Sequence, residues 1–69
     1  MTREQAKAFA ETFGKRLAVD NETVRDNGRP VMTNLIGLAR AETDETRTPL
    51  LAILPHNIRM YWRAVREFG

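Results

Sequence analysis

The sequence HNIRMYWRAVREF, at positions 56–68, separates apolar from basic side chains when it is drawn as an α-helix. Successive residues of a helix are turned by about 100°, so residues three or four apart share a face. Arg59, Arg63 and Arg66 stand at spacings of four and three and form a basic stripe on one side. The other side is broad and apolar, and Trp62 borders the stripe. The apolar side consists of Ile58, Tyr61, Trp62, Val65 and Phe68, widened by Met60 and Ala64.

The N-terminal half begins with a second helical pattern. Thr2 and Gln5 have the spacing of a capping box, which predicts that a helix begins at about residue 3. The apolar residues behind this start recur at spacings of three and four and would share one face: Ala6, Phe9, Ala10, Phe13 and Leu17. The pattern therefore predicts an amphipathic first helix that buries its aromatic side.

The end of this first helix has two interpretations. The helix can continue to residue 27, with Gly28 as its stop, or it can break near Asp20 and restart. The apolar stripe favours one continuous helix over residues 3–27. Pro30 suits the first turn of a new helix, where its missing N–H needs no partner, and predicts a second helix over residues 30–42.

The segment that follows is punctuated by two further prolines. Residues 43–47, TDETR, have no periodicity and indicate a polar loop. Pro49 predicts the start of a short third helix over residues 49–54, which is apolar on every side. Such a helix must lie inside the fold or inside an oligomer interface. Pro55 would then form the corner that leads into the last helix, residues 56–68.

These elements predict a single all-α domain over residues 1–69. No stretch shows the alternating, β-branched pattern of a strand. The expected architecture is a compact orthogonal bundle of three to four helices, at about 3–27, 30–42, 49–54 and 56–68. The apolar side chains of the last two helices exceed what a chain of 69 residues easily buries. A homodimer or an obligate partner surface is therefore also expected.

The composition argues against an enzyme. The chain contains no Cys, no Ser and a single histidine, His56, so an activated nucleophile with a positioned base is not expected. Its four glycines are isolated and match no phosphate-binding motif. We therefore expect no catalytic residues, no cofactor and no metal site.

The chain also lacks the sequence signals of a membrane or secreted protein. Its longest apolar run, residues 50–54, is far shorter than the roughly 18–20 residues of a membrane span. Residues 1–5, MTREQ, are polar and do not resemble a signal peptide. The sequence predicts a cytoplasmic protein without a membrane partner, of the kind encoded by short phage or bacterial open reading frames.

The last helix supplies the candidate binding residues Arg59, Arg63, Arg66, Trp62 and Tyr61. Arginine and tryptophan are frequent among the residues that dominate protein interfaces. The favoured hypothesis is a small regulatory or inhibitory module that docks on a larger protein, with Trp62 and Tyr61 as anchors and the arginines as charge partners.

Other interpretations of the same helix remain open. The arginines could grip the phosphates of a nucleic acid, as in a transcriptional regulator. A net charge of +2 is mild for that role, and base-reading Asn or Gln residues are scarce on this helix. The arginines can also form a solvated face that interacts with the helix dipole, with Trp62 and Tyr61 in the core. A purely structural role in an assembly is a further alternative.

Overall fold

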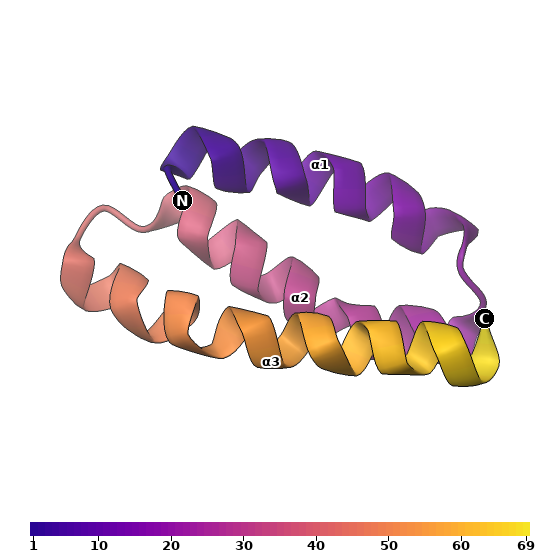
Figure 1. The fold of residues 1–69 in the computed structure, drawn as a ribbon. Helices are drawn as coiled ribbons and strands as arrows, with labels where there is room; N and C mark the ends of the chain where they lie inside the picture. The colour runs from indigo at the N-terminus through magenta and orange to yellow at the C-terminus, as the bar shows by residue number, and fades with distance from the viewer.

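The computed structural model describes residues 1–69 and contains three α-helices and no strand. The helices are α1 (Arg3–Val19), α2 (Glu22–Arg40) and α3 (Asp44–Phe68). They run in alternating directions, and α2 packs against both of the others (Figure 1). The predicted all-α class is confirmed. None of the helices combines the length and the apolar character that a membrane span requires.

The helices lie lengthwise instead of crossing at right angles. The Cα atoms extend over 37 × 20 × 14 Å. A helix rises 1.5 Å per residue, so the 19 residues of α2 span about 28 Å and the 25 of α3 about 37 Å. Neither length fits across the two shorter dimensions. The orthogonal crossing expected from the sequence is thus replaced by antiparallel packing, which short connections favour.

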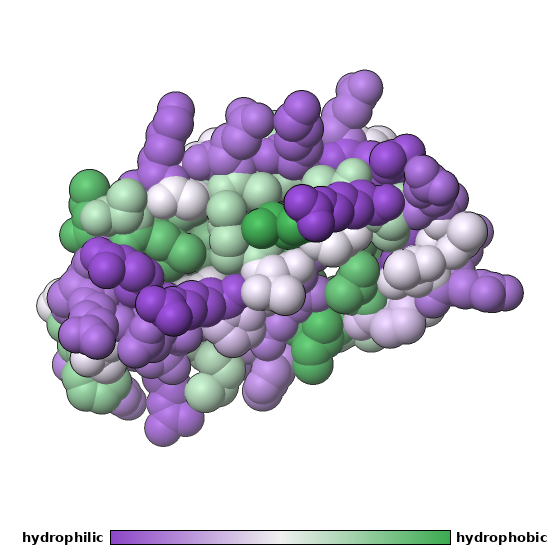
Figure 2. Space-filling view, turned by 180° about the vertical axis from the view of Figure 1, so that it is seen from behind, coloured by the Kyte–Doolittle hydropathy of each residue, from purple (hydrophilic) through white to green (hydrophobic).

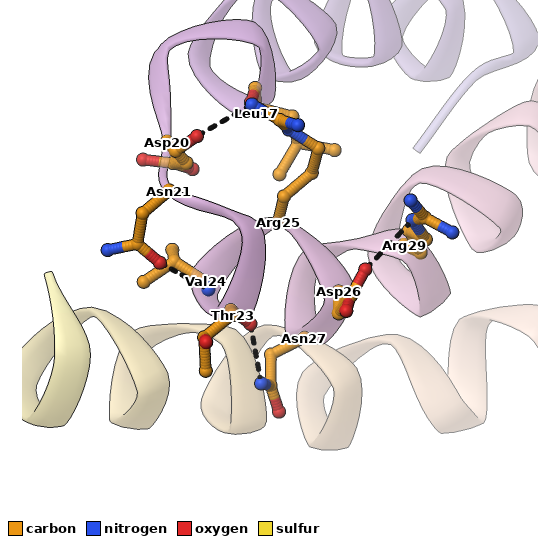
Figure 3. A network of polar contacts seen from close by, with 9 residues as sticks. All are labelled: Leu17, Asp20, Asn21, Thr23, Val24, Arg25, Asp26, Asn27 and Arg29. Carbon is orange, nitrogen blue, oxygen red and sulfur yellow. Dashed lines mark hydrogen bonds and ion pairs between the residues drawn. The ribbon is translucent and has the colours of Figure 1, made fainter.

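The turn between α1 and α2 begins where the first helix breaks. The predicted continuous helix over 3–27 is wrong, and the alternative break near Asp20 is correct: α1 ends at Val19, and Asp20 has extended backbone angles. The side-chain oxygen of Asn21 accepts a hydrogen bond from the backbone N–H of Val24 at 2.9 Å (Figure 3). This N-cap supplies a partner for an amide that a new helix would otherwise leave unpaired.

Arg25 closes the same turn from the side of α2. Its Nε donates to the carbonyl of Leu17 at 3.0 Å, and its Nη2 donates to the carbonyl of Asp20 at 2.7 Å. Both carbonyls lie at the C-terminal end of α1, where the regular helical hydrogen bonds stop; that of Leu17 also accepts from the backbone N–H of Asp20 at 3.2 Å (Figure 3). These hydrogen bonds therefore stabilise the interruption between α1 and α2. The apolar periodicity of the sequence gives no indication of them.

Gly28 and Pro30 lie inside α2 and do not mark the predicted end and start of helices. Gly28 is buried where the three helices approach one another. A Cβ atom at this position would lie 2.4 Å from Leu17 Cδ2 and 2.9 Å from Tyr61 Cδ1. The glycine therefore permits close packing. The disruption caused by Pro30 is outweighed by burial of the apolar residues that follow it on α2.

The segments that follow α2 form one continuous helix, α3, which contains both Pro49 and Pro55. The predicted polar loop over 43–47 is its first turn, because the Thr43 hydroxyl accepts from the N–H of Thr46 at 3.3 Å. Acidic side chains at the start of a helix are also favoured by its dipole. The predicted separate helices at 49–54 and 56–68 are thus a single element.

A buried amide joins α2 to α3 between the two prolines of α3. The Nδ2 of Asn34 donates to the carbonyl of Leu50 at 2.9 Å, and its Oδ1 accepts from Asn57. Asn34 is the only polar side chain in the buried set. Since both its donor and its acceptor are engaged, it links the two helices at a defined register.

The core lies along α2, between the inner faces of α1 and α3. Side chains from all three helices contribute: Ala6, Ala10, Leu17, Val24, Val31, Leu35, Leu38, Leu54 and Tyr61. The small residues of α1 allow it to approach α2 closely. Within the apolar run 50–54, Leu54 is buried but Leu51 and Ile53 remain exposed. The fold itself therefore does not enclose this run as the sequence suggested.

Candidate partner-binding groove

The two outer helices leave a groove between them. No Cα atom of α1 lies within 8 Å of a Cα atom of α3, although α2 approaches both. Side chains of α1 and α3 form the walls of the groove, and Val31 and Leu35 of α2 form its floor. Its volume is about 460 Å³, and nine of its eleven lining residues are hydrophobic. The lining consists of Met1, Phe9, Thr12, Phe13, Arg16, Val31, Leu35, Leu54, Ile58, Tyr61 and Trp62.

Four large apolar side chains of the groove remain accessible to solvent, and the first of them is Met1, which is 42% exposed. Phe9 on α1 is 55% exposed, and on α3 Trp62 is 46% and Ile58 is 38% exposed. Scattered single apolar residues are normal on a protein surface, whereas contiguous ones around a concavity mark a binding site. The groove is therefore the strongest candidate site of the molecule.

A polar cluster closes one end of the groove. Arg16 Nε donates to Tyr61 Oη at 2.9 Å, and Tyr61 Oη donates to Asp20 Oδ2 at 2.6 Å. The Arg16 guanidinium also lies over the Trp62 ring, 4.6 Å from its centroid, in a cation–π arrangement. The Tyr61 ring meets Phe13 edge to face at 4.9 Å. The cluster thus connects α1, the α1–α2 turn and α3 through side chains.

Tyr61 belongs to the core and not to the binding surface. It is 1% exposed, so its predicted role as a surface anchor needs correction. Burial, together with the hydrogen bond to the Asp20 carboxylate, raises the pKa of Tyr61, and the bond from Arg16 opposes the rise. The phenol therefore remains neutral at physiological pH and acts as a structural link. Trp62, its neighbour in sequence, is exposed and lines the groove.

The predicted arginine stripe lies on the outer side of α3, beside the groove but outside its lining. The ion pairs of the protein are Asp26–Arg29 and Arg63–Glu67, the latter at 3.4 Å and exposed. Arg59 and Arg66 are left without an acidic partner. They are three and four residues away from Trp62, so they flank its ring along the helix.

The charged side chains of α3 are all basic over most of its length. Between Thr46 and Arg66 the helix contains four arginines and no acidic residue. Within the groove lining, Arg16 is the only charged side chain. An apolar groove thus adjoins a basic helix surface, and no carboxylate of the lining neutralises it.

The opposite face has a different character. Figure 2 shows the molecule from behind, onto the outward side of α2, where hydrophilic side chains cover most of the surface. Its hydrophobic atoms form separate patches. A shallower pocket between α2 and α3 is lined mainly by polar residues, with Leu50 and Ile53 as its hydrophobic members. Ile53, 45% exposed, is therefore an apolar residue of α3 that lies outside the groove.

The α1 wall of the groove was missed by sequence reasoning. Phe9 was predicted to lie in the core, because Phe9, Phe13 and Leu17 follow one another at intervals of four residues. In the structure, the centre of the buried face is formed by Ala6 and Ala10, and Phe9 lies at its edge. The size difference between these alanines and the phenylalanines is the only sequence signal for this arrangement.

No group of three or more His, Cys, Asp or Glu side chains is arranged to hold a metal ion. No family model, curated protein or solved structure matches this chain. The geometry of the groove and of the arginines beside it therefore carries the functional argument.

Proposed function

We propose that the protein is a non-catalytic regulatory or inhibitory module that docks on a larger protein through the groove between α1 and α3. The observation that carries the proposal is the accessible apolar surface of Phe9, Ile58 and Trp62 around one concavity. Covering such a surface with a partner removes it from water and stabilises the complex. The complete lack of cysteine suits a reducing compartment such as the cytoplasm.

The arginines of α3 give this docking its charge preference. Arg59 and Arg66 have no acidic neighbour within the chain, and Arg63 is engaged only by an exposed pair with Glu67. Exposed pairs of this kind contribute little to stability, so Arg63 can exchange its partner. Charges at the rim of an interface mainly accelerate association and select among partners. The arginines would therefore favour an acidic surface next to the apolar contact.

Nucleic acid is the less favoured partner. Arg59 and Arg66 have no acidic partner and can contact phosphates, which is the observation in favour of nucleic acid. A phosphate backbone would however leave Phe9 and Ile58 uncovered, since backbone contacts are made by charged and polar groups. A protein partner accounts for both the arginines and the apolar groove.

Affinity capture with matched variants tests the proposal. Immobilised wild-type protein, Ile58→Glu and Ile53→Glu are each incubated with an extract of the native cells. The two isoleucines lie on the same helix with 38% and 45% exposure, but only Ile58 lines the groove. We expect a protein retained by the wild type and by Ile53→Glu to be lost with Ile58→Glu. Circular dichroism establishes that both variants are folded.

A parallel experiment covers nucleic acid. Binding of labelled duplex and single-stranded oligonucleotides is followed by anisotropy across a salt series. Tight, salt-sensitive binding that the triple change Arg59→Ala, Arg63→Ala and Arg66→Ala abolishes, and that Ile58→Glu leaves intact, would refute the proposal. Retention of the same proteins by the wild type and by both isoleucine variants in the capture experiment would refute it as well.

A further inference from the structure

We infer that the groove receives one amphipathic α-helix of the partner, with acidic residues along its flanks, and that this helix completes a four-helix bundle. The inference rests on the proposed function and specifies the chemistry of the partner. It follows from the shape of the groove, from its lack of polar groups and from the distribution of charge around it.

The shape of the groove matches a helix of about two to three turns. Its α3 wall runs from Leu54 to Trp62, which corresponds to about 12 Å at 1.5 Å per residue. Leu51 is exposed and lies three residues before Leu54, so helical spacing places it on the same side of α3, about one turn beyond the lining. The α1 wall, from Phe9 to Arg16, spans about 10 Å. The helices α1 and α3 run in the same direction on either side of α2 (Figure 1). A helix bound in the groove antiparallel to both would therefore continue the alternating order of the bundle.

The apolar lining favours a helix over an extended peptide. An extended segment presents backbone N–H and C=O groups that need partners. Besides the Tyr61 hydroxyl, which Asp20 and Arg16 already engage, the groove offers only Thr12, Arg16 and the indole N–H of Trp62 as polar groups. A helix satisfies its own backbone and presents only side chains to the walls. A membrane surface is also a poor match, because it cannot enter a concavity between two helices.

The charge around the groove favours acidic residues on the bound helix. Arg16 lies inside the groove beside Trp62, and Arg59 and Arg66 flank the same ring on the outer side of α3. No acidic residue lines the groove. Carboxylates placed beside the apolar stripe of a bound helix would meet these guanidinium groups, with which they form strong, charge-assisted hydrogen bonds.

The same charges disfavour a second copy of this chain as the occupant. In a twofold-symmetric dimer the identical surface is used by both partners. The α3 helix would then face its own copy, and Arg59 and Arg66 would lie near the equivalent arginines of that copy. Like charges at an interface are unfavourable. The sequence predicted a homodimer or a partner surface without placing it, so a homodimer through this groove is the alternative that the test must distinguish.

Synthetic peptides of about 14 residues, long enough for nearly four helical turns, provide the probe. They carry leucines at positions i, i+3 or i+4, and i+7, with either glutamates or lysines on the flanks and without tryptophan or tyrosine. Trp62 is the only tryptophan of the protein, and its emission moves to shorter wavelength when the groove is filled. We expect saturable binding of the glutamate peptides, about tenfold tighter than that of the lysine peptides. This ratio corresponds to a difference in binding free energy of about 1.4 kcal/mol.

Two variant pairs locate the bound peptide. Ile58→Ala should weaken binding of the glutamate peptide severalfold, whereas Ile53→Ala, of similar exposure outside the groove, should leave it unchanged. Combined Arg59→Ala and Arg66→Ala should abolish the preference for glutamate over lysine. Arg40→Ala, a change of an exposed arginine outside the lining, should preserve that preference.

Several results would overturn the inference. Equal affinity for glutamate and lysine peptides, or equal effects of the two isoleucine changes, contradicts an acidic helix in the groove. A dimer in light scattering that dissociates with Ile58→Glu assigns the groove to a second copy, and a Trp62 shift only with anionic vesicles assigns it to a membrane. If a protein partner is still captured through Ile58 in these cases, the proposed function stands and only the helical, acidic partner is refuted.

Discussion

Substitution of Gly28 by alanine tests the close approach of the three helices on which the fold depends. The added Cβ atom would lie 2.4 Å from Leu17 Cδ2 and 2.9 Å from Tyr61 Cδ1. Carbon atoms in ordinary contact are about 3.5–4.0 Å apart, so both neighbours must move. The Leu17 methyl is the end of a flexible side chain. The Tyr61 ring is held by its hydrogen bond to Asp20 and cannot move as freely.

The expected effect is a difference between two opposing contributions. Forcing an extra methyl group into a packed core costs about 1–3 kcal/mol. Alanine inside a helix is more favourable than glycine by about 1 kcal/mol, which offsets part of this cost. The difference predicts that Gly28→Ala lowers the free energy of unfolding by up to about 2 kcal/mol. In a domain of this size each kcal/mol corresponds to roughly 4–8 °C in Tm.

Gly14→Ala is the matched control, because this glycine also lies inside a helix but has more space. The nearest atom to its added Cβ is Met32 Cε at 3.2 Å, the end of a flexible side chain. We expect this variant to gain about 0.5–1 kcal/mol from helix propensity. Thermal and urea unfolding, followed by far-ultraviolet circular dichroism, compare the two variants. If Gly28→Ala proves as stable as Gly14→Ala, the packing argument is refuted.

Substitutions at three further positions test the polar contacts. The pKa of Tyr61 is raised in the folded state, so the neutral phenol stabilises the wild type at pH values below the ordinary pKa of about 10. This stabilisation is lost as the pH rises through the folded-state pKa, and Tyr61→Phe should abolish that alkaline loss. Urea unfolding between pH 8 and about 11 measures this, and an equally steep decline in Tyr61→Phe would contradict it. Asn21→Ala removes both the cap on Val24 and the hydrogen bond from Asn21 Nδ2 to the carbonyl of Phe68, and should lower the unfolding free energy by about 1–2 kcal/mol in thermal unfolding. Asn21→Asp keeps the cap but loses the second hydrogen bond, and should have a smaller effect. Asn34→Ala leaves the carbonyl of Leu50 without its donor and should cost about 1–3 kcal/mol; an unchanged urea midpoint would show that the buried amide does not link the helices.

Periodicity was sufficient to predict the helical class and much of the inner face of α1. The Thr2–Gln5 capping box is also present, with hydrogen bonds of 2.8 and 3.0 Å. Helix boundaries were harder to predict from the sequence, because each glycine or proline was taken to start or end a helix. Gly28 and Pro55 lie within helices whose packing outweighs those local preferences.

The groove could not be predicted from any one segment of the sequence. Its walls come from helices at opposite ends of the chain, and its existence depends on α1 and α3 both packing on α2. The sequence identified Trp62 and the arginines as candidates, but Phe9 and Ile58 acquire their place only through this tertiary arrangement. Tyr61 was misplaced because its partners Asp20 and Arg16 are distant in sequence.

The floor of the groove has a consequence for how such a protein can change its specificity. Val31 and Leu35 belong at once to the core and to the partner site, so a mutation that reshapes the floor also destabilises the fold. The rim residues Phe9, Arg59 and Arg66 are exposed, and their replacement has little effect on folding. Evolution toward a new partner is therefore expected to proceed through the rim, while the floor stays nearly invariant among chains that bind different helices.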